Sequence, residues 1–164
     1  MDRSATLKHL QQALAMELTA AHQYQLHAAV LDDWGIDRLA KKMRQEMLEE
    51  LGHADQFLKR ILFLKGEPVV TLAKTPAIAR SLRDLFAADA ADENHAIDFY
   101  ANSARVAGES GDVGSRLLFE QILIDEENHM AWLELQLDLI ERITEPAYIA
   151  KHMSVSGDES PEGA

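Results

Sequence analysis

Two Glu-x-x-His sequences constrain this chain more than any other feature. One runs from Glu50 to His53 and the other from Glu126 to His129. On an α-helix, side chains three residues apart lie on the same face, one turn from each other. Each copy can therefore direct a carboxylate and an imidazole at one point in space.

An upstream glutamate extends this pattern into two half-repeats. Glu17 precedes the first Glu-x-x-His sequence by the same interval that separates Glu93 from the second. Together the half-repeats offer four carboxylates and two imidazoles, the ligand set with which a four-helix bundle holds two metal ions in its core. Ligands that are rich in oxygen with some nitrogen suit iron or manganese better than zinc or copper(I).

The apolar residues recur at helical spacing over four long segments, which predicts an all-α fold. We expect helices at residues 4–34, 37–65, 81–107 and 115–143. The connection over residues 67–80 is long enough to cross the length of a bundle. Asp37 and Ser81 are expected to cap the second and third helices.

The end of the chain differs from the bundle in composition. Pro146 allows a short fifth helix over residues 147–153, and the segment after it is polar. We therefore expect one domain over residues 1–153 and a disordered acidic tail over residues 154–164, because such a tail buries too little apolar surface to fold.

Each of the four glutamates falls on the apolar stripe of its helix. An ionised carboxylate that is isolated in an apolar core costs several kcal/mol, or else becomes neutral. A single Glu-x-x-His arises by chance, and single glutamates on long helices usually face solvent. Two copies with the same spacing to two upstream glutamates instead predict that all six side chains bind metal.

Several neighbouring residues are candidates for supporting this centre. Tyr24 and Tyr100 each lie seven residues after a glutamate of the centre, on the same helix face. Tyr24 is a candidate donor to a ligand carboxylate or a participant in electron transfer, whereas an ordinary core role is favoured for Tyr100. Glu49 and Asp125 precede His53 and His129 by four residues and could accept the N–H of these rings. For Glu49, a surface salt bridge is an equally favoured interpretation. The remaining histidines, including His27, are interpreted as ordinary polar positions.

Composition excludes several other classes of protein. The formal net charge of −12 argues against a nucleic-acid partner, which would need clustered Lys and Arg. The chain has no cysteine, which excludes disulfides, thiolate–zinc sites and iron–sulfur clusters. It has no apolar run long enough to span a membrane and no visible secretory signal. We expect a cytoplasmic protein.

Several short stretches, which cover nearly the whole chain up to the tail, are typical of one family. They are Glu17-Leu18, Gln23-Tyr24, Leu26-His27-Ala28, Trp34-Gly35, His53-Ala54-Asp55, Arg60-Ile61-Leu62-Phe63-Leu64, Asp125-Glu126-Glu127-Asn128-His129 and Trp132-Leu133-Glu134. On these stretches the chain resembles the bacterioferritins. The resemblance implies a ferritin-like bundle and a hollow cage of 24 subunits built from symmetric dimers.

The resemblance also implies a ferroxidase centre that takes two irons per subunit. Its ligands by matching position are Glu17, Glu50, His53, Glu93, Glu126 and His129. Glu50 and Glu126 would bridge the two metals. A ferredoxin-like reductant for iron release is a further partner that the resemblance implies.

The chain departs from this family at the haem site. Bacterioferritins bind haem through a methionine directly after the bridging glutamate of the second helix, and here that position is Leu51, which has no donor atom. We therefore expect no haem on this chain alone, which leaves open a subunit that co-assembles with a haem-binding partner subunit.

Iron storage with ferroxidase activity is the function that these features favour. The alternative is a dimeric di-iron or di-manganese redox enzyme related to peroxidases or catalases, which would differ in native mass. The sequence leaves open whether O2 or H2O2 is the oxidant and whether the assembly contains one or two kinds of subunit.

Overall fold

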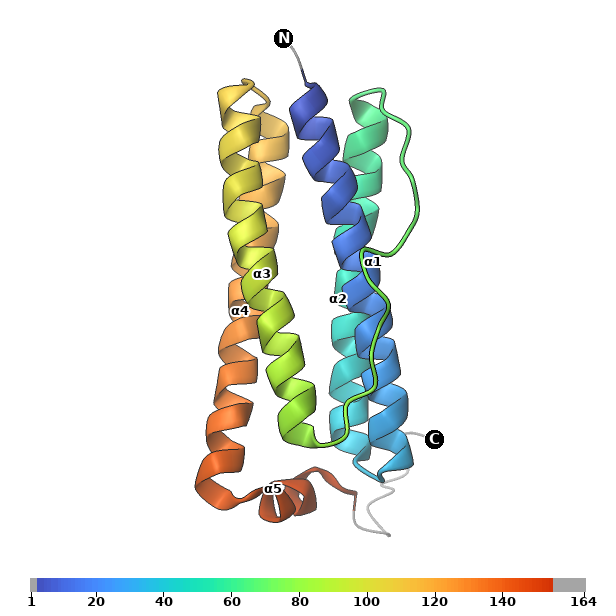
Figure 1. Cartoon of the computed structure of the whole chain (residues 1–164), viewed down its shortest axis with the longest axis vertical. Coiled ribbons are helices and arrows are strands. Elements are labelled where there is room, and N and C mark those ends of the chain that lie inside the picture. The colour runs from blue at the N-terminus through green and yellow to red at the C-terminus, as the bar shows by residue number, and fades with distance from the viewer. Residues whose placement is uncertain (1–2, 155–164) are drawn as a thin grey trace, which may run out of the picture.

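The computed structural model of the chain describes residues 3–154. Most of the expected tail, residues 155–164, therefore lies outside the described residues. Within them, α1 (Ser4–Asp33) and α2 (Asp37–Phe63) form one antiparallel hairpin, and α3 (Leu82–Glu109) and α4 (Val113–Ile143) form the other. The two hairpins lie side by side in an elongated bundle (Figure 1).

A long segment of irregular chain, residues 64–81, connects the two hairpins and is called the crossover below. It returns along α1 to the opposite end of the bundle, so that α2 and α3 run in the same direction (Figure 1). The short helix α5 (Glu145–His152) packs across that end. The all-α four-helix bundle with one long crossover and a short fifth helix is thus confirmed.

The turn between α1 and α2 contains a left-handed glycine and contradicts one predicted helix cap. Gly35 takes the left-handed conformation with φ of 76°, as expected of a residue just beyond a helix, and the next residue, Ile36, donates its N–H to Leu31 at 2.8 Å. Asp37 does not cap α2 but is its first helical residue. Its carboxylate instead accepts the backbone N–H of Ser154 at 2.8 Å.

The other helix ends lie within two residues of the predicted ones. Ser81 caps α3 through its hydroxyl, as predicted. Asp112 caps α4 by accepting the N–H of Ser115 at 3.2 Å, so this helix begins two residues earlier than expected. The second helix ends at Phe63 rather than Lys65, because Lys65 takes the left-handed conformation with φ of 65°.

Side-chain hydrogen bonds hold the crossover against α1 at three of its residues, which are spaced four apart. Side chains of α1 bind its backbone in three places, which pair Gln11 with Val69, Thr19 with Ala73, and Gln23 with Ala77. The side-chain amide of each glutamine donates to the carbonyl and accepts from the N–H of the same crossover residue. These bonds fix the path of a segment that has no regular secondary structure of its own.

The apolar core of the bundle consists of two separate clusters. One lies towards α5 and includes Leu31, Phe86 and Tyr148. The other lies towards the opposite end, where Phe57 and Phe119 pack with ring centroids 5.6 Å apart. The six predicted ligand residues belong to neither cluster. A polar layer therefore crosses the bundle between the two apolar clusters.

The fifth helix is held at the end of the bundle by polar contacts. The Tyr148 hydroxyl donates to Gln136 of α4 at 2.7 Å, and the Glu145 carboxylate accepts the N–H of Leu82 at 3.1 Å. Within residues 3–154, every helix is either too short or too polar to span a lipid bilayer.

Candidate metal centre

The polar layer contains six ionisable side chains that come from all four long helices. Each is at most 8% exposed, and they are Glu17 of α1, Glu50 and His53 of α2, Glu93 of α3, and Glu126 and His129 of α4. Every one of these positions was predicted from the two half-repeats. The helical spacing places each glutamate on an inward face, and the packing of the two hairpins brings the four faces together.

The six side chains form two groups that share two members. Glu17 and His53 complete one group, Glu93 and His129 complete the other, and Glu50 and Glu126 belong to both. Within each group, one candidate ligand atom from each residue lies within 4.8 Å of the others. Glu50 and Glu126 are thus placed where a carboxylate could bridge two ions.

The imidazoles face the carboxylates through equivalent nitrogens. His53 Nδ1 lies 3.3 Å from both Glu17 Oε2 and Glu126 Oε1, and 3.4 Å from Glu50 Oε2. His129 Nδ1 lies 3.1 Å from Glu126 Oε2, 3.2 Å from Glu50 Oε1 and 3.8 Å from Glu93 Oε1. The two rings lie 6.4 Å apart between centroids.

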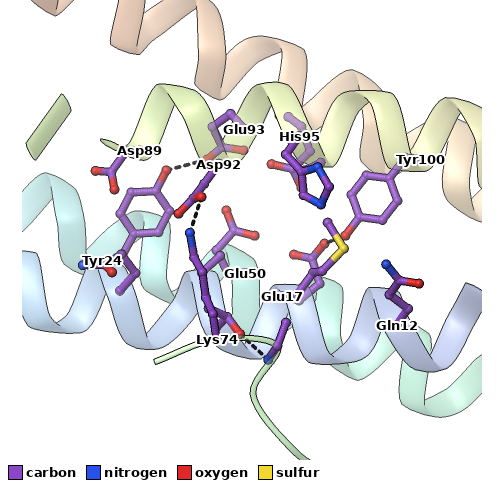
Figure 2. Close-up of a pocket in the computed structure, with 17 residues that line it drawn as sticks. Gln12, Glu17, Tyr24, Glu50, Lys74, Asp89, Asp92, Glu93, His95 and Tyr100 are labelled. Carbon is purple, nitrogen blue, oxygen red and sulfur yellow. Dashed lines mark hydrogen bonds and ion pairs between the residues drawn. The ribbon is translucent and has the colours of Figure 1, made fainter. Parts of the chain in front are cut away.

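Two tyrosines bind the outer carboxylates of the centre, and each comes from the opposite hairpin. Tyr24 of α1 donates to Glu93 Oε1 at 2.6 Å, and Tyr100 of α3 donates to Glu17 (Figure 2). Burial, followed by the charge of Glu93, raises the pKa of Tyr24. The hydrogen bond predicted for Tyr24 is present. For Tyr100 we favoured an ordinary core role, and this prediction did not include its hydrogen bond to Glu17. The two tyrosines occupy equivalent positions in the two half-repeats, so the repeat contained this signal.

The outer nitrogens of the imidazoles face a second group of acids. His53 Nε2 lies 3.4 Å from Asp125, and His129 Nε2 lies 3.2 Å from Glu46 and 3.5 Å from Glu49. The predicted pairing of Glu49 with His53 and of Asp125 with His129 was wrong. Each ring points across the interface between α2 and α4 rather than along its own helix. Glu46 was not predicted, although it lies one turn before Glu50.

Without a bound cation, the raised pKa values of several groups of the centre favour their protonated forms. Burial raises the pKa of Glu17 and of Glu93, and the neighbouring glutamates Glu50 and Glu126 raise these pKa values further. Burial opposes ionisation of Glu50, but the adjacent imidazoles of His129 and His53 outweigh it and lower the pKa of its carboxyl. Burial would lower the pKa of His129, but Glu126 and Glu50 raise it to about 12.

Several polar atoms of this layer are buried without a hydrogen-bond partner among the described residues. They are Glu17 Oε2, Glu50 Oε1, Glu126 Oε1, His53 Nδ1 and His129 Nε2. Each such atom costs about 1 to 3 kcal/mol when left unsatisfied. Two divalent cations would satisfy the inward-facing atoms and balance the four carboxylates, so the residues present fit a pair of metal ions.

A further buried polar cluster lies next to the centre. His27, interpreted from sequence as an ordinary polar position, is only 1% exposed. Its Nδ1 lies 3.1 Å from Asp89 Oδ2, and its Nε2 lies 2.8 Å from the amide nitrogen of Gln23. His27 is thus satisfied by two side chains and is not a ligand of the centre. The cluster links α1 to α3 and, through Gln23, to the crossover.

The residue after Glu50 points away from the centre. Leu51 is 40% exposed on the outer face of α2, where the family pattern would place a haem-binding methionine. Its side chain offers no donor atom to an iron. The absence of haem on this chain stays a prediction.

Known proteins resemble this chain in both sequence and fold. A model of the ferritin-like domain family matches residues 7–143. A bacterioferritin of Brucella melitensis is 40% identical over 142 residues, which cover 87% of this chain and 88% of that protein. A Rhodobacter capsulatus bacterioferritin, solved with a metal-free dinuclear site and a haem iron, has a TM-score of 0.90 at 35% identity, covering 93% of this chain and 95% of that one. Mycobacterium tuberculosis bacterioferritin BfrA also has a TM-score of 0.90 at 35% identity, covering 94% and 97%.

Proposed function

The chain belongs to the bacterioferritin family of ferritin-like proteins, and we propose that it stores iron by oxidising Fe²⁺ at the buried centre of each subunit. The observation that carries this proposal is the pair of overlapping ligand groups with Glu50 and Glu126 in common. Two metals held by shared carboxylates lie about 3.5–4 Å apart, a distance at which one small oxidant can contact both.

The reaction takes one electron from each of two Fe²⁺ ions. With hydrogen peroxide, two Fe²⁺, one H2O2 and two protons give two Fe³⁺ and two water molecules. With dioxygen, two Fe²⁺, one O2 and two protons give two Fe³⁺ and one H2O2. Four carboxylates stabilise the additional positive charge of the Fe³⁺ products, because opposite charges interact strongly in a buried site.

The tyrosines hold the outer ligands in position for this chemistry. Glu17 and Glu93 each belong to only one of the two ligand groups, and each accepts a hydrogen bond from a tyrosine of the opposite hairpin. A hydrogen bond of this kind fixes the orientation of a ligand carboxylate and tunes its affinity for the metal.

Assembly into a cage would cover apolar surface that a single subunit leaves exposed. Large apolar side chains stand out from α2 and the crossover, among them Leu48, Leu62, Phe63, Val69 and Val70. Exposed apolar groups on this scale are typical of surfaces that bind another protein. We therefore expect copies of this chain, or a second subunit type that binds haem, to assemble into a cage of about 24 subunits, the size that the family resemblance implies.

The test compares two neighbouring glutamates of α4. Glu126 lies in both ligand groups, whereas Glu127 is exposed on the surface of the same helix. We expect Glu126→Ala to abolish rapid Fe²⁺ oxidation, followed by the absorbance of Fe³⁺, and Glu127→Ala to keep the wild-type rate. Glu50→Ala should behave as Glu126→Ala does. Equal initial rates in wild type and both centre variants would refute the assignment.

Native mass separates the proposal from its main alternative. A storage cage has about 24 subunits, whereas a stand-alone di-iron or di-manganese redox enzyme of this size would be a dimer. Size-exclusion chromatography with light scattering distinguishes the two. An absorption spectrum of the same sample would reveal any bound haem.

A further inference from the structure

A buried chain of three side chains connects α3 to the crossover. Asp89 of α3 and His27 and Gln23 of α1 are each at most 7% exposed. His27 Nδ1 lies 3.1 Å from Asp89 Oδ2, and His27 Nε2 lies 2.8 Å from Gln23 Nε2. Gln23 in turn forms two hydrogen bonds of 2.9 Å with the backbone of Ala77 in the crossover. These three side chains are called the clasp below.

The backbone of Ala77 fixes the orientation of the Gln23 amide. An N–H can only donate and a carbonyl can only accept, so Gln23 Oε1 faces the N–H of Ala77 and Gln23 Nε2 faces its carbonyl. The NH2 group of Gln23 is therefore also the group that faces His27 Nε2. Because this NH2 group only donates, His27 Nε2 accepts, and the single ring proton lies on Nδ1, which donates to Asp89.

A second ring proton on His27 does not fit this arrangement. It would lie on Nε2 and point at the NH2 group of Gln23, so that two donors would face each other. The contact is relieved only if Gln23 moves away or if its amide turns over. A turned amide would place its NH2 group against the N–H of Ala77 and its oxygen against the carbonyl. Both movements break the hydrogen bonds between Gln23 and the crossover.

Few other charges act on this histidine. Within residues 3–154, Asp89 is the only ion-pair partner of His27 on any helix. Burial raises the pKa of Asp89, the hydrogen bond from His27 opposes this rise, and Asp92 and Lys74 act on the same pKa with opposite signs. Tyr24 stays uncharged because burial and the nearby carboxylates raise the pKa of its hydroxyl. A proton taken up by Asp89 would leave the Gln23 amide in place, since a protonated carboxyl still accepts from Nδ1.

We propose that the clasp is an acid-sensitive device that fastens the crossover to the bundle and releases it when His27 takes up a second ring proton. Because Nε2 is free to bind this proton only in the released form, a fall in pH shifts the equilibrium towards release. The crossover contributes Ala73 and Lys74 to the lining of a cavity of about 250 Å³ beside the four glutamates of the centre (Figure 2). Release therefore loosens one wall of this cavity. The inference does not depend on the proposed oxidation of iron.

The crossover contains a matched control for this device. Gln11 holds Val69 through the same pair of hydrogen bonds, 2.5 Å from its Nε2 to the carbonyl and 2.9 Å from the N–H to its Oε1. Among the described residues, the side chain of Gln11 has no titratable partner. Acid should therefore leave this attachment unchanged while it releases Ala77.

The test is hydrogen exchange of the assembled, metal-free protein at pH 8 and at pH 5, read by mass spectrometry on peptides that separate Val69 from Ala77. After correction for the intrinsic exchange rate, we expect the protection of the Ala77 N–H to fall about tenfold at pH 5, the size expected for one net hydrogen bond. The protection of Val69 should not change. Equal protection of Ala77 at the two pH values would overturn the proposal, and so would an equal fall at Val69.

Two substitutions then assign the effect to His27. His27→Gln keeps one donor and one acceptor in the clasp but takes up no proton, so Ala77 should be equally protected at both pH values. Gln23→Glu should reverse the trend, because a carboxylate accepts both from a doubly protonated His27 and from the N–H of Ala77. A fall at pH 5 as large as in wild type, in either variant, would overturn the proposal. Circular dichroism and native mass verify that each variant folds and assembles, and Gln23→Glu tests the clasp by itself if His27→Gln does not.

Discussion

Replacing Tyr24 with phenylalanine removes one hydroxyl and leaves the ring in place, so it isolates the hydrogen bond to Glu93. Tyr24 is only 3% exposed, and its hydroxyl lies 2.6 Å from Glu93 Oε1. A hydrogen bond to a charged group contributes about 1.5 to 3 kcal/mol. Because each 1.4 kcal/mol corresponds to a factor of about ten in affinity, we expect Tyr24→Phe to weaken metal binding by about 10- to 100-fold.

The loss should fall on one half of the centre. Glu93 belongs only to the ligand group of His129, whereas Glu17 belongs only to the group of His53. An anaerobic Co²⁺ titration that resolves two binding steps should therefore show one weakened step in Tyr24→Phe. Tyr100→Phe, which removes the hydrogen bond to Glu17, should weaken the other step.

Tyr148 provides a matched control. Its hydroxyl is also buried and donates to a side chain, Gln136 Oε1, at 2.7 Å. That contact lies in the apolar cluster near α5, away from the centre. Tyr148→Phe should lower the free energy of unfolding and leave both Co²⁺ affinities unchanged. If Tyr148→Phe weakened Co²⁺ binding as much as Tyr24→Phe does, the effect would be one of global stability and the reasoning about Glu93 would be refuted.

Other properties of the protein follow from the same structure. Burial opposes ionisation of Asp112, but hydrogen bonds from Ser115 and the ion pair with Arg60 outweigh it and lower the pKa of this carboxyl. Asp112→Asn should therefore lower the free energy of unfolding by about 1 to 2 kcal/mol at pH 7, as measured by urea unfolding. Because a lowered folded pKa stabilises the protein only where the carboxyl of the unfolded chain is ionised, the difference from wild type should shrink below about pH 4. Phe119→Ala should cost about 3 to 5 kcal/mol in the same assay, since this fully buried ring packs against two other aromatic rings. The raised pKa values of Glu17 and His129 mean that metal must displace protons, so Co²⁺ loading in unbuffered solution should release acid, detected with a pH electrode, and Co²⁺ affinity should fall as the pH is lowered.

The repeat made the clustering of these six buried side chains predictable from the sequence. A glutamate on the apolar stripe of a helix lowers stability because its carboxylate is buried. Two half-repeats that both carry such glutamates at the same spacing indicate that these residues act together. The side-chain geometry follows from two rules, the helical period and the packing of inward faces. Neither rule needs knowledge of which helices are neighbours, because all four inward faces meet in a bundle.

What the sequence could not predict are the contacts between helices. Asp125 and Glu49 were assigned to the rings on their own helices, but each faces the ring on the other helix. His27 was read as an ordinary polar position because its partner Asp89 lies 62 residues away. Such pairs depend on the rotation of each helix about its axis, which is set by packing across the whole bundle.

Helix ends were predictable to about two residues, and the causes of the differences are local. Asp37 carries the type of side chain that caps helices, yet its carboxylate bonds to Ser154 near the far end of the described chain. Lys65 takes a left-handed conformation that glycine adopts more readily, and Gly66 follows it directly. In both cases, tertiary contacts or the path of the chain override the local preference.

The exchange of partners between the two hairpins means that neither can assemble its half of the centre alone. Tyr24 of the first hairpin holds Glu93 of the second, and Tyr100 of the second holds Glu17 of the first. Asp125 and Glu49 exchange rings in the same way. Each hairpin is therefore an incomplete chelator that the other completes. Under the proposed function, metal loading links the docking of the two hairpins to iron oxidation, so an isolated half-chain should neither bind metal tightly nor oxidise iron.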